Sequence, residues 1–274
     1  MSESSLSQAP LGRDVTYPQT YDPSQLFPIE RAETRASLQQ PGPWFGADVW
    51  NAYEVSWLNA RGLPRAALAR FTVPADSPRL IESKSFKLYL NSFNESRYEG
   101  VDEVASLMQA DLSRVAGAEV KVELRDRLDE LSATYPPLDG TCLDNLDVEI
   151  EHYLPEPGLL KCDSEAMQVT ESLVSHLLKS NCPVTGQPDW GSVRIRYTGP
   201  RISRESLLKY IVSFRRHTEF HEHCVERMYC DIWQAIQPES LMVMALYTRR
   251  GGLDINPWRS SHPVELGPLR TIRQ

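Results

Sequence analysis

The chain has 274 residues, of which 41% are hydrophobic and 24% are charged, and its formal net charge is −8. This length can bury one large core or two cores of about 100–130 residues each, and no stretch approaches the roughly 18 consecutive apolar residues of a membrane-spanning helix. The acidic balance argues against a broad nucleic-acid surface. The first residues lack the basic and apolar regions of a secretion signal, so we expect a soluble cytoplasmic protein with no membrane partner.

Cysteine usage points to the same compartment. The five cysteines are odd in number, form no CxxC pair and are too sparse for a disulfide scaffold: Cys142, Cys162, Cys182, Cys224 and Cys230. Free thiols of this kind fit a reducing cytoplasm.

The first 43 residues differ in composition from the rest. Residues 1–43 are rich in Ser, Gln and Pro, which predicts an extended N-terminal arm that cannot form a core of its own. Leu26, Phe27 and Ile29 are apolar anchors that can hold such an arm to a folded domain. From about residue 44 onward, helix and strand patterns are mixed.

Hydrophobic spacing predicts the main elements. Apolar residues at helical spacing predict a helix over 101–115 that ends at Gly117, and a second helix over 220–236 that ends before Pro238. Alternating apolar residues predict strands over 120–124, 193–197 and 241–247.

Two segments of the second half repeat segments of the first. Residues 81–93 match 202–214 at an offset of 121, and 55–58 match 174–177 at an offset of 119. Repeats in one order at nearly one offset indicate an internal duplication. The sequence therefore predicts an arm, two similar α+β domains and a Pro/Glu-rich connector between them, with the boundaries 1–43 for the arm, 44–150 for the first domain, 151–169 for the connector and 170–274 for the second domain.

A thiol precedes a turn-forming stretch in the second half. Cys182 is followed by Pro183, Gly186 and Pro188, which restrict or bend the backbone, so 181–190 is predicted to be a shaped loop. Asp189 lies seven residues after the thiol, as a proton partner of a nucleophile often does. A cysteine attacks as the thiolate. The alternative is a buried and inert cysteine, a common fate for this residue.

Other polar residues divide between the halves. The first half carries Glu82 and the i,i+3 pair Lys84 and Lys87, which are either ligand groups or a solvated basic face. The second half carries the run 217–224, in which His221 and Glu222 begin the predicted helix. Duplicated domains that divide their functional groups often form a site between the copies, so we expect one here.

Two further patterns are weaker. The run 217–224 lacks the His-Glu-x-x-His motif and the spaced second Cys pair of zinc sites, so we predict no metal there. Arg249, Arg250, Gly251 and Gly252 follow a predicted strand and suit either a phosphate contact or an ordinary turn. No Gly-x-Gly-x-x-Gly follows a strand, so no Rossmann cofactor site is visible.

Taken together, four motifs resemble one enzyme family. The segments 82–89, 182–189, 220–222 and 249–252 resemble the NADPH-dependent 7-cyano-7-deazaguanine reductases, the nitrile reductases of queuosine biosynthesis, and the likeness covers nearly the whole chain in the long, two-domain form. The resemblance implies an α+β fold of two tandem tunnelling-fold (T-fold) domains, with antiparallel sheets and helices on one face. It also implies a homodimer, a small-molecule substrate and no catalytic metal.

The resemblance also assigns roles. It implies that Cys182 attacks the nitrile carbon, that Asp189 supplies a proton and that His221 assists. The residues implied to line the substrate site are Glu82, Ser83, Lys84, His221 and Glu222, and those implied to contact NADPH are Lys84, Ser85, Arg250 and Gly251.

Two other functions are kept as alternatives. One is a zinc-dependent cyclohydrolase of the same superfamily that uses the Cys and His groups. The other is a non-catalytic purine-binding module in which Cys182 is inert. Composition and spacing alone predict a cytosolic two-domain α+β protein with a candidate thiol site.

Overall fold

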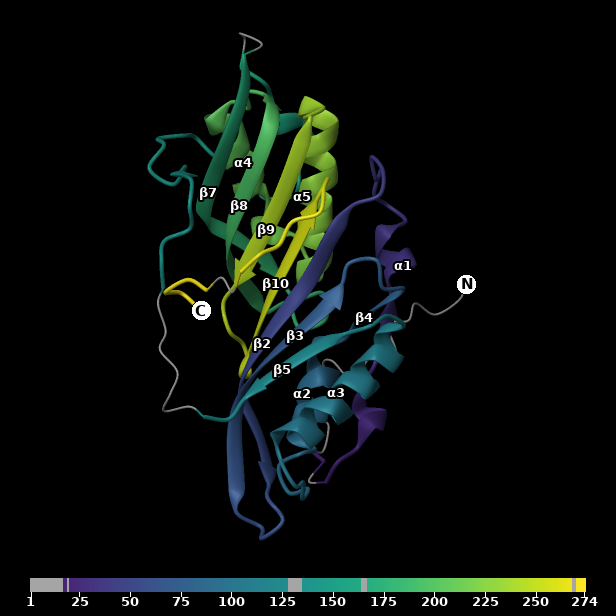
Figure 1. Cartoon of the computed structure of the whole chain (residues 1–274). Coiled ribbons are helices and arrows are strands. Elements are labelled where there is room, and N and C mark those ends of the chain that lie inside the picture. The colour runs from purple at the N-terminus through teal and green to yellow at the C-terminus, as the bar shows by residue number, and fades with distance from the viewer. Residues whose placement is uncertain (1–16, 19, 128–134, 164–166, 268–269) are drawn as a thin grey trace. The chain divides into compact units, whose positions relative to one another are not determined.

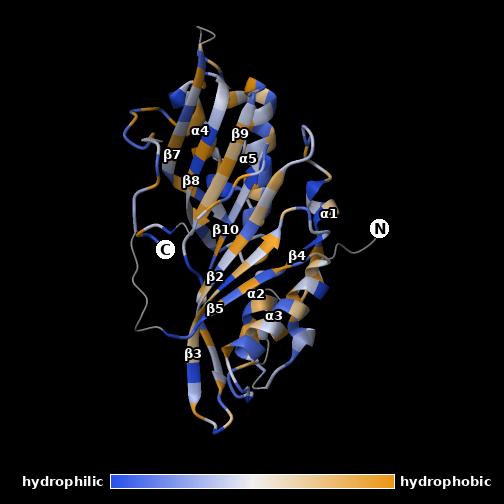
Figure 2. Cartoon of the chain, viewed as in Figure 1, coloured by the Kyte–Doolittle hydropathy of each residue, from blue (hydrophilic) through white to orange (hydrophobic). Residues whose placement is uncertain are grey.

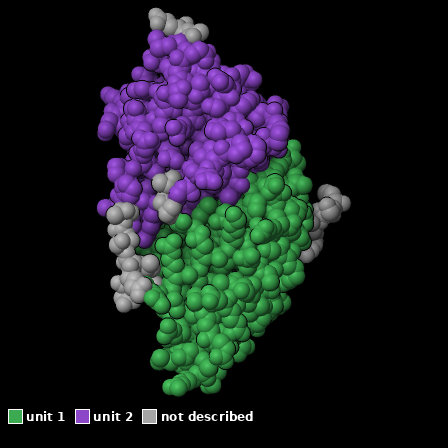
Figure 3. All heavy atoms as spheres, viewed as in Figure 1, with its two compact units in different colours: residues 1–36, 48–133, 249–254 green, residues 37–47, 134–248, 255–274 purple. Residues whose placement is uncertain are grey.

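The computed structural model describes residues 17–18, 20–127, 135–163, 167–267 and 270–274. Part of the predicted arm (1–16 and 19) and part of the predicted connector (164–166) lie outside these ranges. The chain divides into two compact units (Figure 3): unit 1 contains residues 1–36, 48–133 and 249–254, and unit 2 contains 37–47, 134–248 and 255–274. Each unit thus takes a short segment from beyond the boundaries expected from the sequence. Within the described ranges every helix is too short or too polar to cross a lipid bilayer.

Unit 1 combines a strand layer with two main helices. Strands β5, β3 and β2 are neighbours in that order, and β3 pairs antiparallel with β5. A separate two-stranded sheet is formed by β1 and β4. The elements are η2 (Pro23–Gln25), β1 (Pro28–Glu30), α1 (Arg31–Arg35), β2 (Phe45–Leu58, from residue 48 in this unit), β3 (Pro64–Pro74), β4 (Arg79–Ile81), α2 (Ser83–Asn91), α3 (Val101–Ala116) and β5 (Lys121–Arg125).

The helix predicted over 101–115 is confirmed as α3. Val104, Met108 and Leu112 recur at helical spacing and are fully buried, and α3 packs against β4 and β5. Gly117 ends the helix with φ +74°, a left-handed conformation that glycine adopts at little steric cost. Figure 2 shows both hydrophobic and hydrophilic colours along α3, as an amphipathic helix requires.

The described part of the predicted arm is bound to unit 1. Phe27 donates its backbone N–H to Ser85 Oγ at 3.0 Å, and Glu82 donates its N–H to the Phe27 carbonyl at 2.9 Å. Ile29, in β1, is fully buried. Residues 17–36 therefore hold the start of α2 in place, which the composition of the arm does not reveal.

Unit 2 has the larger strand layer. Its strand order is β10-β9-β8-β7-β6, antiparallel where β7, β8, β9 and β10 pair and parallel between β6 and β7. Helices α4 and α5 cover one face of this layer (Figure 1). The elements are β6 (Thr141–Cys142), η4 (Pro157–Leu159), β7 (Gln168–Asn181), β8 (Pro188–Pro200), α4 (Arg204–Ser213), η5 (Phe214–Arg216), α5 (His221–Ile236), β9 (Ser240–Tyr247) and β10 (Leu253–Ser260, from residue 255 in this unit).

Strand β9 is buried on both faces. Leu241, Val243 and Ala245 face the helix-covered core, as their alternation predicts. The residues between them also pack, because a second cluster covers the opposite face. That cluster consists of Leu138, Val174, Met242, Met244 and Leu246. The alternation therefore identified a strand but could not indicate that both of its faces are covered.

The two units repeat one order of elements. In each, two long strands are followed by two helices and a further strand, and α4 begins 121 residues after α2 while α5 begins 120 residues after α3. The 81–93 match therefore aligns equivalent helices. The 55–58 match does not align equivalent strand positions, since β7 ends 123 residues after β2 rather than 119. The described chain is a mixed α+β fold with a mainly antiparallel sheet, as predicted.

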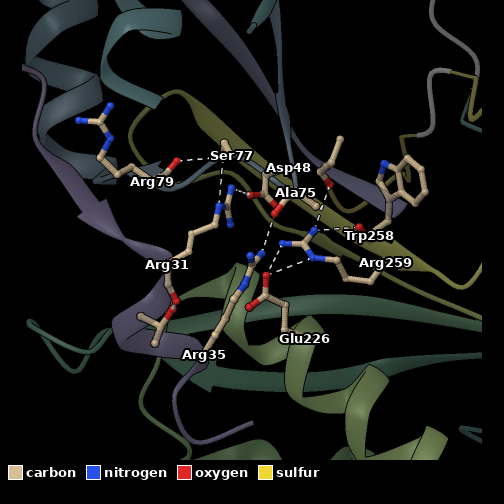
Figure 4. A network of polar contacts seen from close by, with 11 residues as sticks. Arg31, Arg35, Asp48, Ala75, Ser77, Arg79, Glu226, Trp258 and Arg259 are labelled. Carbon is tan, nitrogen blue, oxygen red and sulfur yellow. Dashed lines mark hydrogen bonds and ion pairs between the residues drawn. The ribbon is translucent and has the colours of Figure 1, made fainter. Parts of the chain in front are cut away.

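Each unit buries an arginine–carboxylate pair (Figure 4). In unit 1, Arg31 binds Asp48 and also donates to Ser77 Oγ at 3.1 Å, with 2% and 1% of the Arg31 and Asp48 side chains exposed. In unit 2, Arg259 binds Glu226 at 2.7 Å, and both side chains are buried. Buried charges of this kind are tolerated because each has an ionised and hydrogen-bonded partner.

Removal of one member of the unit 1 pair should be costly. We expect Arg31→Met to lower the free energy of unfolding by about 3–5 kcal/mol, because Asp48 is left buried without its cation, as measured by urea unfolding. The matched control is Arg65→Met in the exposed Arg65–Asp126 pair (3.5 Å), which should cost less than about 1 kcal/mol. Equal losses in the two variants would contradict the assignment.

Candidate active site

The hairpin of β7 and β8 holds the thiol segment. Ser180 pairs with Asp189 and Asn181 with Pro188, and Cys182 then donates its N–H to the Gln187 carbonyl at 2.9 Å. Gly186 closes the turn at φ +65°. The predicted loop over 181–190 is therefore too long: the turn covers only 182–187. Pro188 extends the strand instead of breaking it, because proline is tolerated as the first residue of a strand.

This register sets which side chains share a face. Side chains alternate along a strand, so Ser180 and Cys182 point to the same side of the sheet, as does Asp189 opposite Ser180. Cys182 and Asp189 are thus diagonal neighbours across the hairpin, a relation that brings Cα atoms to about 7–8 Å. Both are largely buried, with 3% and 6% of their surface exposed. The hairpin brings a thiol and a carboxyl together in a desolvated position.

His221 joins this pair from the first residue of α5. Its Nε2 lies 3.7 Å from Asp189 Oδ1, and 14% of its side chain is exposed. The Tyr247 ring packs against the imidazole, with 4.1 Å between ring centroids and an angle of 80°. Cys182, Asp189 and His221, the three residues predicted to be catalytic, therefore lie in one group in unit 2, named the reactive cluster.

Asn181 connects the hairpin to the segment before α5. Its backbone N–H donates to the His217 carbonyl at 2.8 Å, and its carbonyl accepts from the Glu219 N–H at 3.1 Å. Lys179 Nζ in turn donates to Asn181 Oδ1 at 2.6 Å. These bonds fix the distance between the strand that carries Cys182 and the helix that carries His221.

Three further residues of the cluster were missed from the sequence. Ser180 and Tyr247 are buried beside Cys224, whose pKa is raised to about 12 by burial, while the Ser180 hydroxyl opposes part of the shift. The Cys224 thiol therefore stays protonated at neutral pH and does not compete as a nucleophile. The signal for Ser180 was its position two residues before Cys182 in a strand, but the segment was interpreted as a loop.

Glu222 follows His221 in the first turn of α5. It is 3% exposed, and its carboxylate lies where the positive end of the helix dipole favours an anion. A carboxylate held at this depth can accept hydrogen bonds from a ligand that enters beside His221.

The predicted residues of unit 1 gather at the start of α2. Glu82 is fully buried and caps the helix, since its carboxylate accepts the backbone N–H groups of Lys84 and Ser85, each at 2.7 Å. Burial raises the pKa of this carboxyl, and the two backbone hydrogen bonds oppose the rise. Ser83 begins the helix, with its hydroxyl 3.4 Å from Glu82 Oε1. The Ser85 hydroxyl donates to the Glu82 carbonyl at 2.7 Å.

The glycine turn lies next to α2 within unit 1. Gly251 has φ +61°, and a Cβ added there would approach Lys87 Cδ and Cε to 3.2 Å. Gly252 has φ +77° and lies against the Glu54 carboxyl, and the Arg249 guanidinium lies 4.6 Å from the centroid of the Tyr53 ring. Arg250 is half-buried in this turn. The turn thus combines backbone that only glycine fits with cationic side chains, the chemistry of an anion site.

Two protein-family models match the chain. One, described as "Nitrile reductase, 7-cyano-7-deazaguanine-reductase N-term", matches residues 17–124, and one described as "QueF-like protein" matches 188–265. A protein of Bordetella avium named NADPH-dependent 7-cyano-7-deazaguanine reductase is 58% identical, with 97% of this chain and 99% of that protein covered. One of the same name from Chromohalobacter salexigens is 54% identical and covers 99% of both chains. The chain belongs to the 7-cyano-7-deazaguanine reductase family.

The family resemblance predicted from the four motifs is therefore confirmed. Identity above half over nearly the full length means that the arm, the hairpin and the glycine turn all fall within the aligned region. A solved structure of the archaeosine synthase QueF-Like in its apo form covers 38% of this chain and all of its own, at 20% identity and a TM-score of 0.31, which is too low to support an argument.

Protonation of His217, beside the reactive cluster, should make stability depend on pH. Burial, and then the charge of Arg227, lowers the His217 pKa to about 4 from an ordinary value near 6.5. The unfolded chain therefore binds more protons between these values, so this contribution to stability is complete above pH 6.5 and is lost as the pH falls to 4. We expect the midpoint of urea unfolding to depend less steeply on pH between 4 and 6.5 in His217→Asn than in the wild type. The control is His152→Asn, which removes an exposed histidine and should keep the wild-type dependence. The same dependence on pH in His217→Asn as in the wild type would contradict this.

Proposed function

We propose that this chain reduces the nitrile of 7-cyano-7-deazaguanine to the aminomethyl group, with two NADPH per turnover, in tRNA queuosine biosynthesis. The names of its close relatives support the reaction and the cofactor. The observation that carries the proposal is the hairpin register, which places Cys182 and Asp189 on one buried face with His221 beside them. A nucleophile, a proton donor and a second proton-transfer group in one cluster suit addition to a nitrile.

In this proposal Cys182 forms the bond to the substrate, and Asp189 and His221 carry out the proton transfers. The Cys182 thiolate adds to the nitrile carbon, and Asp189 gives a proton to the nitrile nitrogen, which yields a neutral thioimide on sulfur. Two NADPH molecules, bound in turn, would each supply one hydride, which is what reduction of a nitrile to an aminomethyl group requires. His221 takes the proton that the Cys182 thiol loses and, 3.7 Å from Asp189, passes it to that carboxylate after Asp189 has given its own proton to the nitrogen.

Carboxylates suit the substrate ring. The deazaguanine base presents N–H donors along one planar edge, and ionised carboxylates are acceptors only. Following the family resemblance, we assign Glu222 and Glu82 to hydrogen bonds with this edge and Ser83, Lys84 and His221 to substrate contacts. Glu82 Oε1 already accepts from the Lys84 N–H and the Ser83 hydroxyl. Its Oε2 accepts the Ser85 N–H and has a second lone pair for a ligand.

The glycine turn and α2 fit the anionic cofactor. The Lys87 side chain packs against Gly251, where any Cβ would meet it, so this turn holds a cation directly beside a glycine backbone, a combination that suits a phosphate. We assign Lys84, Arg250 and Gly251 to NADPH contacts. Ser85 contributes by holding the first turn of α2, because its hydroxyl is bound to Glu82 and Phe27.

We further propose that the units are tandem T-fold domains, for which the repeated order of strands and helices is the support. The boundaries 44–150 and 170–274, with the arm and the connector outside them, stay a prediction. A homodimer in the cytoplasm is the expected assembly, and the net charge of −8 speaks against a nucleic-acid partner.

Adduct formation tests the nucleophile. Incubation with the nitrile but without NADPH should add the mass of one substrate to the intact protein, mapped to Cys182. Cys182→Ala should abolish both the adduct and NADPH oxidation, because burial keeps the neighbouring Cys224 thiol protonated and unable to replace it. Cys224→Ala is the matched control and should keep the adduct. An adduct on Cys224, or turnover by Cys182→Ala, would disprove the assignment.

Loss of the Glu222 carboxylate should weaken substrate binding. Removing an acceptor from a closed pocket costs about 1–3 kcal/mol, so Glu222→Ala should bind the nitrile roughly 10–100-fold more weakly. Calorimetry on the Cys182→Ala background measures this without covalent capture. The control is Glu205→Ala, an exposed acidic residue in the first turn of α4, which should leave the affinity unchanged. Equal affinities in both variants would remove Glu222 from the substrate site.

A further inference from the structure

A second group of reactive side chains lies elsewhere in unit 2. We propose that Cys142, Asp144 and His176 form a binding site for one divalent metal ion, best suited to zinc. One ligand atom of each residue lies within 4.8 Å of the others: the Cys142 sulfur, an Asp144 carboxylate oxygen and a His176 ring nitrogen. Tetrahedral zinc holds its ligand atoms roughly 3.5 Å apart, so small side-chain rotations close the site.

The backbone brings these residues together by strand pairing. β6 runs parallel to β7, with Cys142 opposite Val174, and Leu143 donates its N–H to the Val174 carbonyl at 2.8 Å. Two residues beyond that point on each strand lie Asp144 and His176. The β7–β8 register shifts between Ser175 and Leu178, and such irregularities re-aim side chains.

Hydrogen bonds orient two of the three ligands. Asp144 accepts the Ser175 hydroxyl at 2.7 Å and the His176 backbone N–H at 2.9 Å, which fixes its carboxylate over the bulge. The His176 ring is held at Nδ1 by Ser192 Oγ at 2.8 Å. Its Nε2 makes no hydrogen bond with the described part of the chain. Metal-binding histidines are oriented in this way through their other ring nitrogen.

The donor set selects the metal. A thiolate, an imidazole and a carboxylate together suit zinc, whereas magnesium and calcium prefer oxygen ligands alone. With the thiol and carboxyl ionised, the two negative charges balance Zn²⁺. Cys142 is exposed and the other two are half-exposed, so an ion can enter and water can complete the coordination. A purely structural role, in which Asp144 binds the backbone of the β7 bulge, would explain Asp144 but not the presence of Cys142 and His176 beside it.

The site is separate from the reactive cluster. Val193 and Ile195 of β8 face the helix-covered core, as does Asp189 by alternation, whereas Ser192 faces the opposite side of the sheet. His176, bound to Ser192, therefore lies on the side away from Asp189. A metal there would fasten β6 to the bulge of β7, which is a stabilising role rather than a step in nitrile reduction.

Zinc content tests this directly. Tag-free full-length protein is stripped with a chelator, incubated with zinc sulfate, desalted and measured by inductively coupled plasma mass spectrometry. Wild type should hold one zinc per chain, and Cys142→Ser and His176→Gln should bind about 100-fold more weakly in competition with a colorimetric chelator. The midpoint of thermal unfolding of the wild type should rise on the order of 5 °C at zinc about 100 times its dissociation constant. At the same zinc concentration Cys142→Ser and His176→Gln should show little or no rise.

The controls separate this site from other thiols. Cys162→Ser and His152→Gln remove an exposed cysteine and an exposed histidine elsewhere and should keep the zinc. Cys182→Ala should also keep it, so the result stands whether or not the proposed reductase activity does. Cobalt(II) should give a thiolate charge-transfer absorption that Cys142→Ser lacks. A wild type that retains no zinc, or Cys142→Ser that binds as tightly as wild type, would overturn the proposal.

Discussion

The antiparallel register of β7 with β8 is the constraint on which the reactive cluster depends. A shift of one residue would turn Asp189 to the other face of the sheet while Cys182 kept its direction. The register is held at its end by the turn over 182–187 and by the Asn181 bonds to 217–219. Because the same bonds position the start of α5, the placement of His221 follows from the placement of the thiol.

Several charged side chains are buried away from water, and each needs a partner that replaces its lost hydration. Glu82 is buried, and backbone N–H groups of α2 meet its carboxylate; Arg31 and Glu226 are buried with partners of opposite charge. Such groups add little net stability but permit few other conformations, since any alternative leaves a charge unpaired in a low dielectric. The side chains packed around the start of α2 and around α5 are thereby held in defined positions.

Local patterns predicted much of the fold. The apolar faces of α3 and α5 and the glycine that ends α3 are local sequence signals. Residue spacing alone therefore identified these helices. The motifs at 82–89, 182–189, 220–222 and 249–252 predicted the family, and relatives more than half identical over nearly the full length confirm it. The turn chemistry at Cys182 was also visible, although Pro188 was wrongly taken as loop rather than as the start of β8.

The sequence by itself determined the two long helices α3 and α5, the duplicated order, the family and the residue types available for chemistry. Only the tertiary structure decided that Ser180 and Tyr247 border the buried Cys224 thiol, that Phe27 holds the start of α2, and that Cys142 and Asp144 meet His176. Each of these depends on contacts between residues more than 20 positions apart. Periodicity records the direction of a side chain within its own element, whereas the partner across a sheet is fixed by register, bulges and packing that no local pattern encodes.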